Sequence, residues 1–327
     1  MTSASSLGTM VVLGIDVGGS GCRMRLHSPA GPTPTVHRDG RRVAGDGVDV
    51  AALVEQIRAG WDQLGAERVD AIAVGMAGLL TLTADPAALQ RSLARICAAP
   101  VVLLASDVLT SHVGALGLAG GVVVAAGTGA VALGTDLREQ WHRSDGWGHL
   151  LGDEGSGAWI GAAGLRAALR AHDGRPNGSA PLLRRLTDRW GHPDRLPAQL
   201  YPHRDAAARL AAFVPDVVAA ATAGDVVSAA LLTRAGQLLA ETATAALAEG
   251  VPPRVSWAGG LFQLPLLLDA FHAAVGAVRP DAALAPPCGT SLDGAVLLAS
   301  AAVTDPTRLP VHDRYLRYHS EIEGEPR

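Results

Sequence analysis

The chain has 327 residues, of which 48% are hydrophobic and 18% are charged, and its net charge at pH 7 is −4. This composition is sufficient for about two packed domains and too poor in charge for a disordered chain. All 27 basic residues are arginine. A Walker-A loop, a protein kinase and a pyridoxal-phosphate enzyme each need a lysine, so these classes are excluded. The acidic balance also argues against a nucleic-acid partner.

The cysteines Cys22, Cys97 and Cys288 are far apart and form no CxxC pair. This spacing argues against a disulfide framework, a zinc knuckle or a metal cluster held within one chain. The N-terminus lacks the basic and then apolar order of a secretory signal, so we expect a protein of the reducing cytoplasm. Residues 113–135 carry no charge, but their glycines and alternation favour a buried hairpin over a membrane helix. We therefore expect no membrane partner.

The first third of the chain alternates predicted strands and helices. An apolar run at 11–15 ends at Asp16, and a glycine-rich segment separates it from a second, alternating run at 22–26. This order predicts a strand, a turn and a strand. Apolar spacing and start signals then predict, in order, a helix at 49–64, a strand at 69–74, a helix at 85–97, a strand at 101–104 and a helix at 108–118.

The opening pattern returns in the middle of the chain. A strand at 121–126, a glycine turn at 127–129 and a strand at 130–133 repeat it about a hundred residues later, which suggests a duplicated domain. A polar loop follows at 140–157. The elements predicted after it are helices at 158–171, 204–221 and 225–247, a strand at 255–257, and helices at 263–275 and 291–303. The alternation of strands and helices indicates an α/β fold.

Two glycine turns are candidate phosphate loops. Glycines let the backbone approach a phosphate and aim N–H groups at it, and a carboxylate at a strand end, such as Asp16, can hold hydrated Mg²⁺. A tight turn without a ligand explains either segment equally well. The first turn is not a dinucleotide fingerprint, because a strand rather than a helix follows it. The turn residues are Gly18, Gly19 and Ser20 in the first, and Gly127, Thr128 and Gly129 in the second.

Asp107 is the single acid within residues 101–113. It follows a predicted buried strand, and ligands of α/β proteins bind at the carboxyl ends of such strands. There it could accept the proton of an attacking hydroxyl during phosphoryl transfer. Its other interpretation is an N-cap for the helix that starts at Val108, and the two roles are compatible.

The polar loop contains the groups that commonly bind sugars. Trp147, His149, Asp153 and Glu154 offer an indole that can stack, an imidazole and two carboxylates. Structural roles remain open at this stage. His149 can be a structural histidine, Glu154 a first-turn acid and Asp153 the N-cap of the next helix.

A Gly-Gly pair follows the strand predicted at 255–257. Gly259 and Gly260 would permit the flat approach of an adenine or ribose, with Gln263 nearby. A Gly-Gly pair alone is weak support for a nucleotide site.

Together these motifs resemble the actin, hexokinase and heat-shock-chaperone ATPase superfamily, in which two phosphate hairpins, a catalytic Asp and a Gly-Gly adenosine motif occur in this order. The string GWGHLLGDEGS at 146–156 resembles the N-acetylglucosamine kinase branch, which includes activator ATPases of acyl-CoA reductases. The longer string QWHRSDGWGHLLGDEGS at 140–156 is similar to bacterial glucosamine kinases. The resemblance covers residues 11–302.

The resemblance implies a two-lobed actin-like ATPase fold of the α/β class (ribonuclease H-like), with a duplicated mixed-sheet domain and commonly a homodimer. The N-terminal ATPase lobe would span 1–115, and a C-terminal helix at about 306–327 could pack on it. The larger lobe would span 116–305 and carry the second hairpin, the sugar loop and the adenosine motif.

The resemblance also implies residue roles. Asp16 would orient Mg²⁺ through water, and Asp107 would be the general base on the sugar 6-hydroxyl. The ATP phosphates would meet Gly18, Gly19 and Ser20 on one side and Gly127, Thr128 and Gly129 on the other. The nucleoside would be bordered by Gly259, Gly260 and Gln263. The sugar would be bound by Asp107, Thr128, Trp147, His149, Asp153 and Glu154.

The substrate that we predict is free glucosamine, phosphorylated by ATP to glucosamine 6-phosphate and ADP. Kinases of the acetylated sugar carry Ser-Asn after the second turn, where this chain has Ala130 and Val131, and residues 38–47 contain no Asn. The acids Asp107, Asp145, Asp153 and Glu154 would suit a cationic sugar. The alternatives are an N-acetylglucosamine or general hexose kinase and, with less support from the cysteines, a reductase activator ATPase or a sugar sensor.

Overall fold

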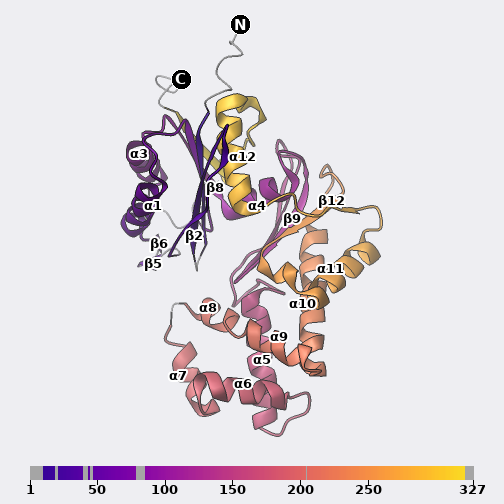
Figure 1. The fold of residues 1–327 in the computed structure, drawn as a ribbon. Helices are drawn as coiled ribbons and strands as arrows, with labels where there is room; N and C mark the ends of the chain where they lie inside the picture. Colours follow the sequence, from indigo (N-terminus) through magenta and orange to yellow (C-terminus); the bar gives the residue numbers. More distant parts are fainter. Residues whose placement is uncertain are drawn as a thin grey trace.

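The structure is a computed structural model that describes residues 10–18, 21–39, 43–44, 47–78, 85–203 and 205–320. Two mixed β-sheets enclose a pair of helices, α4 (Asp107–Leu116) and α12 (Ser291–Thr304), as Figure 1 shows. Helix α4 contacts strands of both sheets, and α12 packs on α4 and on the first sheet. These two helices therefore join the halves of the molecule.

The first sheet has seven strands. They are β1 (Val12–Val17), β2 (Cys22–Ser28), β3 (Gly31–Pro32), β4 (Val36–Arg38), β7 (Ala71–Met76), β8 (Val101–Ser106) and β14 (Leu316–Ser320). Their order is β14-β8-β7-β1-β2-β3, with β4 paired to β2. Helices α1 (Val50–Leu64) and α3 (Pro86–Ile96) cover the face opposite α12. A separate ribbon pairs β5 (Val43–Ala44) with β6 (Gly47–Val48).

Alternate side chains of the buried strands supply a core on each face of this sheet. Ile15 packs into the core that contains Leu53 of α1, whereas Val12 and Ala73 pack into the core that contains Leu298 of α12. Successive residues of a strand point to opposite faces, so a strand covered on both faces reads as a continuous apolar run. This is why the apolar runs in the sequence predicted these strands.

The second sheet has five strands. They are β9 (Gly121–Ala126), β10 (Ala130–Thr135), β11 (Trp141–Asp145), β12 (Arg254–Ala258) and β13 (Ala283–Leu284), in the order β11-β10-β9-β12-β13. Helix α10 (Val226–Ala245) packs on this sheet, and α11 (Pro265–Val278) packs on α10.

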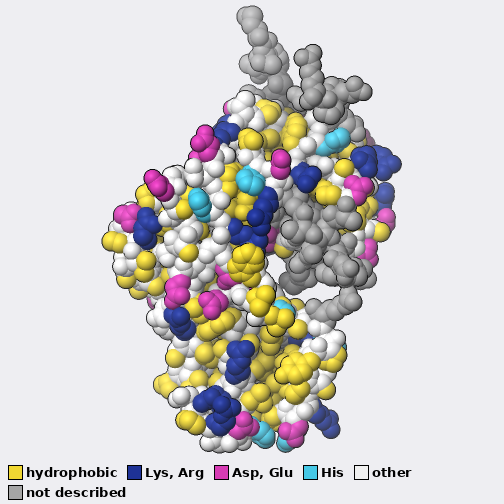
Figure 2. Space-filling model, turned by 180° about the vertical axis from the view of Figure 1, so that it is seen from behind, with side chains coloured by type: hydrophobic (Ala, Val, Ile, Leu, Met, Phe, Trp, Pro, Cys, Tyr) yellow, Lys and Arg dark blue, Asp and Glu magenta, His cyan; other side chains and the backbone are white. Residues whose placement is uncertain are grey.

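A helical extension lies at the lower end of Figure 1. It comprises α5 (Gly157–His172), α6 (Ala180–Trp190), α7 (Leu196–Leu200), α8 (Ala206–Ala211) and α9 (Val214–Thr222). Figure 2 shows apolar side chains gathered over this lower part of the molecule. Short 3₁₀ helices occur at η1 (Pro193–Arg195), η2 (Gly260–Gln263) and η3 (Pro306–Arg308).

The two sheets share one connectivity. β1 pairs antiparallel with β2 and parallel with β7, and β9 pairs antiparallel with β10 and parallel with β12. The next strands, β8 and β13, extend each sheet in parallel. The expected α/β fold of two lobes with a duplicated mixed-sheet domain is therefore confirmed.

Helix starts agree with the sequence signals. Asp49 accepts a hydrogen bond from the Ala52 N–H at 3.0 Å and caps α1, and Asp85 accepts one from Ala88 at 2.9 Å and caps α3. A side chain that accepts from the first turn satisfies an N–H that has no partner within the helix.

Several expected elements differ from the structure. The tail expected as a helix at 306–327 contains η3 and the strand β14 in its described part, because the free edge of β8 takes a strand partner there, with Leu316 opposite Ala105. The polar loop at 140–157 begins with β11, which pairs with β10. The single helix expected at 204–221 is two helices, α8 and α9, with Pro215 in the first turn of the second.

Residues 113–135 are the end of α4 and the β9–β10 hairpin, so the hairpin prediction is correct for 121–135 and wrong for 113–116. Among the described residues, none of the helices has the length and apolar character needed to cross a bilayer.

Candidate active site

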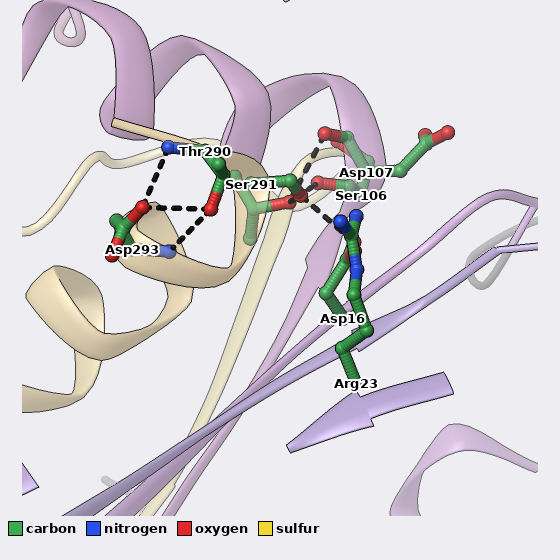
Figure 3. Close-up of polar contacts among 8 residues, drawn as sticks. Asp16, Arg23, Ser106, Asp107, Thr290, Ser291 and Asp293 are labelled. Carbon is green, nitrogen blue, oxygen red and sulfur yellow. Dashed lines mark hydrogen bonds and ion pairs between the residues drawn. The ribbon is translucent and has the colours of Figure 1, made fainter. Parts of the chain in front are cut away.

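Asp107, predicted as the general base, and Asp16, predicted to orient Mg²⁺, lie at one edge of the first sheet. The parallel register places Asp16 opposite Gly75 of β7, and Gly75 opposite Ala105 of β8. Asp107 is the residue directly after β8 and the first residue of α4. Parallel strands end at a common edge, where ligands of α/β proteins bind, so Asp16 and Asp107 flank one place in the fold (Figure 3).

Asp16 is buried, and both of its carboxylate oxygens are hydrogen-bonded. Arg23 of β2 donates from Nε to Oδ2 at 3.0 Å and contacts the same oxygen through Nη2. The Ser291 hydroxyl at the start of α12 donates to Oδ1 at 2.9 Å. The Asp16 side chain is 9% exposed and that of Arg23 is 45% exposed. A buried carboxylate needs such compensation for its lost hydration.

Asp107 is the first helical residue of α4 and not its cap. The cap is Ser106, whose hydroxyl accepts a hydrogen bond from the Leu109 N–H at 3.3 Å. The Asp107 Oδ1 atom accepts from the Val108 N–H at 2.9 Å, and Figure 3 shows its side chain directed away from the Asp16–Ser291 contact. The capping role therefore belongs to Ser106, and Asp107 holds its carboxylate at a helix N-terminus, where negative charge is favoured.

The first glycine turn is described only at its ends. The Gly18 N–H donates to the Gly21 carbonyl at 2.8 Å, and the strand pairing around it places Asp16 opposite Arg23. Gly19 and Ser20, which were predicted to meet the phosphates, lie outside the described residues.

The second glycine turn is fixed on a helix. The carbonyl oxygens of Gly127 and Thr128 accept hydrogen bonds from Gly157 at 2.8 Å and from Ala158 at 3.0 Å, which are the first residues of α5. Gly127 and Thr128 are exposed, and Gly129 is half-buried. The N-terminus of α5 thus holds this turn in place while the Thr128 side chain stays accessible.

The Gly-Gly motif lies next to the second turn. Ala258 of β12 pairs in parallel with Ala125 of β9, so both strands end together. Gly259 has a φ of 102°, and a Cβ placed on it would lie 2.0 Å from the Ala126 carbonyl oxygen. Only glycine permits this approach. The structure therefore brings Gly259 and the exposed Gly260 beside residues 127–129, with Gln263 exposed in the following 3₁₀ helix.

Asp145 anchors the polar loop that follows β11. Its Oδ1 accepts from the N–H groups of Gly146 at 2.7 Å and Asp153 at 2.8 Å, and its Oδ2 accepts from Glu154 at 2.8 Å. The sequence suggested that Asp145 belongs to an acidic pocket for a cationic sugar. Asp145 does line the pocket described below, and its two oxygens also accept backbone hydrogen bonds that close the loop on itself.

Asp153 faces the second glycine turn. It is buried, and a Cβ placed on Gly129 would lie 2.7 Å from its Oδ2 atom. Burial raises the pKa of the Asp153 carboxyl, and the charge of Asp145 adds to this shift against backbone hydrogen bonds from Ala130 and Gly148. The cap of α5 is Ser156, so the interpretations of Asp153 and Glu154 as helix-start residues are wrong.

The outer part of the loop borders a pocket. Trp147 is 68% exposed, with the Arg143 guanidinium 5.0 Å from its ring centroid. A pocket of about 300 Å³ lies beside this loop. It is lined by Ser144, Asp145, Trp147, Leu151, Gly152, Glu154, Glu241 and Thr242. Trp147 and Glu154 thus share one pocket, to which α10 adds two residues that the sequence did not indicate. His149 is half-buried and is not among the residues that line this pocket.

Three side chains around Asp16 were not predicted from the sequence, namely those of Arg23, Thr110 and Ser291. Arg23 is visible in principle, because it lies directly opposite Asp16 across the hairpin. Ser291 is 275 positions from Asp16, and Thr110 reaches Asp16 only through Ser291, at 2.7 Å between their hydroxyl oxygens. A contact between distant segments has no local signal in one sequence.

The donor set at this edge fits Mg²⁺ carried by a nucleotide. Asp16 and Asp107 offer carboxylate oxygens, and the described part of the chain contains no cluster of three or more His, Cys, Asp or Glu that could cage a metal. Mg²⁺ usually keeps several waters and binds through one or two carboxylates together with substrate phosphates.

Comparison with known proteins gives a consistent result. Residues 13–299 match the BadF/BadG/BcrA/BcrD ATPase family. An N-acetylmuramic acid/N-acetylglucosamine kinase of Clostridium acetobutylicum is 29% identical over 178 residues, which are 50% of this chain and 55% of that protein. An N-acetyl-D-glucosamine kinase of Dictyostelium discoideum is 51% identical over 53 residues, 16% of this chain and 17% of that protein.

A crystal structure from Chromobacterium violaceum, assigned as an N-acetylglucosamine kinase, has a TM-score of 0.65 and 27% identity, covering 89% of this chain and 99% of that one. This similarity confirms the two-lobed actin-like fold over most of the chain. At the sequence level, the chain aligns with about half of the Clostridium relative and with less of the Dictyostelium relative.

Proposed function

The chain belongs to the BadF/BadG/BcrA/BcrD ATPase family, and from this premise we propose that it is an ATP-dependent kinase of an amino sugar. The reaction would transfer the terminal phosphoryl group of ATP to the sugar 6-hydroxyl, giving a sugar 6-phosphate and ADP. The observation that carries the proposal is the convergence of Asp16 and Asp107 at one sheet edge. In the second lobe, Asp153 lies against the second glycine turn, which supports a sugar site beside a phosphate site.

Free glucosamine is the substrate that we favour. Ala130 and Val131 stand where kinases of the acetylated sugar carry Ser-Asn, and neither side chain can hydrogen-bond an acetamido group. Glu154 and Glu241 at the pocket would attract the ammonium group of glucosamine. N-acetylglucosamine is the second candidate, because the curated relatives are named as kinases of acetylated sugars.

In this mechanism the chain acts mainly by positioning and by electrostatics, as is general for phosphoryl transfer. Asp107 accepts the proton of the sugar 6-hydroxyl as the new O–P bond forms. Amide groups of the two glycine turns would face the phosphates, and Asp153 would hold a sugar hydroxyl. Asp16 would hold Mg²⁺ through water, and the ion would neutralise charge on the outer phosphates.

The remaining expectations stand as parts of the same proposal. Lobes of about 1–115 and 116–305 would close over the substrates, with α4 and α12 between them, and would limit hydrolysis of ATP by water. In the structure α12 packs on β1 and β7, so the helix at the end of the second segment belongs spatially with the first sheet. A homodimer and a cytoplasmic location complete the proposal.

A substrate panel tests the substrate assignment. Glucosamine, N-acetylglucosamine and glucose are supplied separately with MgATP, and sugar phosphate is quantified. We expect glucosamine to have the highest kcat/KM. A higher value for the acetylated sugar would transfer the assignment to that substrate. ATP hydrolysis that no sugar stimulates, with no sugar phosphate formed, would favour an ATP-driven activator.

A further inference from the structure

Two hydroxyl groups, of the buried Thr110 and the half-buried Ser291, connect Asp16 with the first turn of α4. The Ser291 Oγ atom lies 2.9 Å from Asp16 Oδ1 and 2.7 Å from Thr110 Oγ1. The Thr110 hydroxyl in turn lies 3.0 Å from the backbone carbonyl oxygen of Asp107. Figure 3 shows Ser291 at the start of α12, between Asp16 and the end of β8. These contacts tie Asp16 to the first turn of α4, the helix that begins at the proposed base Asp107.

Glycines make room for this connection. Thr110 is fully buried against β7, where a Cβ on Gly75 would lie 2.4 Å from Thr110 Oγ1. Two more glycines lie where α4 and α12 cross. A Cβ on Gly114 would lie 2.0 Å from the Thr290 carbonyl oxygen, and a Cβ on Gly294 would lie 1.9 Å from the Thr110 carbonyl oxygen. Each contact is too close for any side chain, so the two helices are held at one separation that lets the hydroxyls meet.

The start of α12 is also tied to the first hairpin. Thr290 and Asp293 form a reciprocal capping box, in which the Thr290 N–H donates to Asp293 Oδ2 at 2.7 Å. Asp293 forms an ion pair with Arg25 of β2. These contacts fix the backbone at Ser291 relative to the hairpin that presents Asp16. The Ser291 hydroxyl is therefore held within hydrogen-bond distance of Asp16.

The number of protons on each group decides which group donates in each of these hydrogen bonds. Each hydroxyl has one proton to donate, and a carboxylate can only accept. Hydrogen bonds to a charged acceptor are about twice as strong as neutral ones. The Ser291 proton therefore goes to Asp16, which leaves the Thr110 hydroxyl as the donor in the 2.7 Å contact with Ser291. Both hydroxyls thus stabilise Asp16, and loss of either weakens the same unit.

We propose that Thr110 and Ser291 are positioning residues for phosphoryl transfer, which fix Asp16 relative to Asp107. This inference rests on the proposed kinase function. Neither hydroxyl touches the reacting atoms. Their removal therefore changes where Asp16 holds the nucleotide-borne cation relative to the base, while the sugar loop at 146–154 keeps its own contacts.

The test uses Thr110→Val, Ser291→Ala and the double variant, with Thr110→Ser and Ser291→Thr as conservative partners. We expect each hydroxyl loss to lower kcat by about 10- to 100-fold, the effect of a misplacement near 1 Å, with the sugar KM changed less than about twofold. The double variant should lose no more than the worse single variant, because the two hydroxyls act as one unit. The conservative variants should recover most of the activity.

Binding supplies a readout that does not depend on turnover. The affinity for Mn²⁺ in the presence of ADP is measured by electron paramagnetic resonance of the free ion, and we expect Ser291→Ala to weaken it severalfold. The control is Ser300→Ala on the same helix. Among the described residues its hydroxyl bonds to the Val296 carbonyl of its own helix alone, so this variant should leave all values unchanged. If Thr110→Val does not fold, Ser291→Ala against Ser291→Thr carries the test alone.

Additive losses in the double variant, a sugar KM effect without a kcat effect, or unchanged Mn²⁺ affinity in Ser291→Ala would overturn the proposal. Failure of the kinase function is a separate result. In that case the wild-type chain forms no sugar phosphate, whereas the Mn²⁺ measurement still shows whether the hydroxyls position Asp16.

Discussion

Replacing Gly75 by alanine should damage both stability and catalysis. The added Cβ would lie 2.4 Å from Oγ1, 2.7 Å from Cγ2 and 3.0 Å from Cβ of Thr110, all well inside van der Waals contact. Thr110 is fully buried, so it cannot swing into solvent. Overpacking of this kind costs about 1–3 kcal/mol. The cheapest relief is rotation of the Thr110 side chain, which breaks its 2.7 Å contact with Ser291.

The assay combines urea unfolding with steady-state kinetics. We expect Gly75→Ala to lose about 1–3 kcal/mol of unfolding free energy and at least about tenfold in kcat. Adding Thr110→Ala removes the two nearest clashing atoms, Oγ1 and Cγ2, and keeps only the Cβ atom at 3.0 Å, so the pair should recover most of the stability but none of the activity. This separation distinguishes loss of the connection from general damage.

The matched control is Gly276→Ala in α11, where an added Cβ would meet no atom within 4 Å. Alanine is favoured over glycine inside a helix by about 1 kcal/mol, so this variant should be slightly more stable and fully active. A Gly75→Ala variant that keeps wild-type stability and kcat would refute the reasoning. A Gly75→Ala/Thr110→Ala double variant that recovers both stability and kcat would refute it as well.

Three further predictions address the acids. Asp107→Asn should lower kcat by about 10²- to 10⁴-fold with ADP affinity unchanged by calorimetry, and equal kcat would show that another group is the base. Asp145→Ala removes the acceptor of three backbone hydrogen bonds, so it should raise the sugar KM at least about tenfold while the ATP KM stays within twofold, in a two-substrate kinetic series. Because burial raises the pKa of Asp153, folding favours the neutral form of this carboxyl. Asp153 therefore adds to the unfolding free energy at low pH, and this contribution is lost as the pH rises through the folded-state pKa. Asp153→Asn should therefore melt above the wild type at neutral pH, and this difference should shrink as pH falls; a pH-independent difference would contradict the burial argument.

The fold could be predicted where signals are local. The apolar runs that became β1 and β8, and the caps Asp49 and Asp85, each depend on neighbouring residues, and the structure agrees with them. The strand β14 could not be found in this way. Its partner β8 is some two hundred residues earlier in the chain, and only the open edge of that strand explains why the tail is extended.

The positions of the two acids at one sheet edge could be predicted from the sequence, but the hydrogen-bond partners of the polar residues around them could not. Asp107 and Asp16 stand at strand ends, which is a local signal with a general physical meaning. The sequence could not tell that Ser106 caps α4 or that Asp145 serves the backbone, because neighbouring polar residues compete for the same N–H groups and only the folded geometry selects among them. Ser291 became visible only when α12 was placed against β1.

The central claim is that Asp107 removes a proton from a sugar hydroxyl during phosphoryl transfer. Single-turnover reaction of enzyme-bound MgATP with glucosamine, with the product identified by phosphorus and proton NMR, tests it most directly. We expect glucosamine 6-phosphate from the wild-type chain and a rate at least about 100-fold lower from Asp107→Asn, at equal ATP occupancy. Equal single-turnover rates for the two proteins, or phosphate released to water in place of the sugar phosphate, would contradict it.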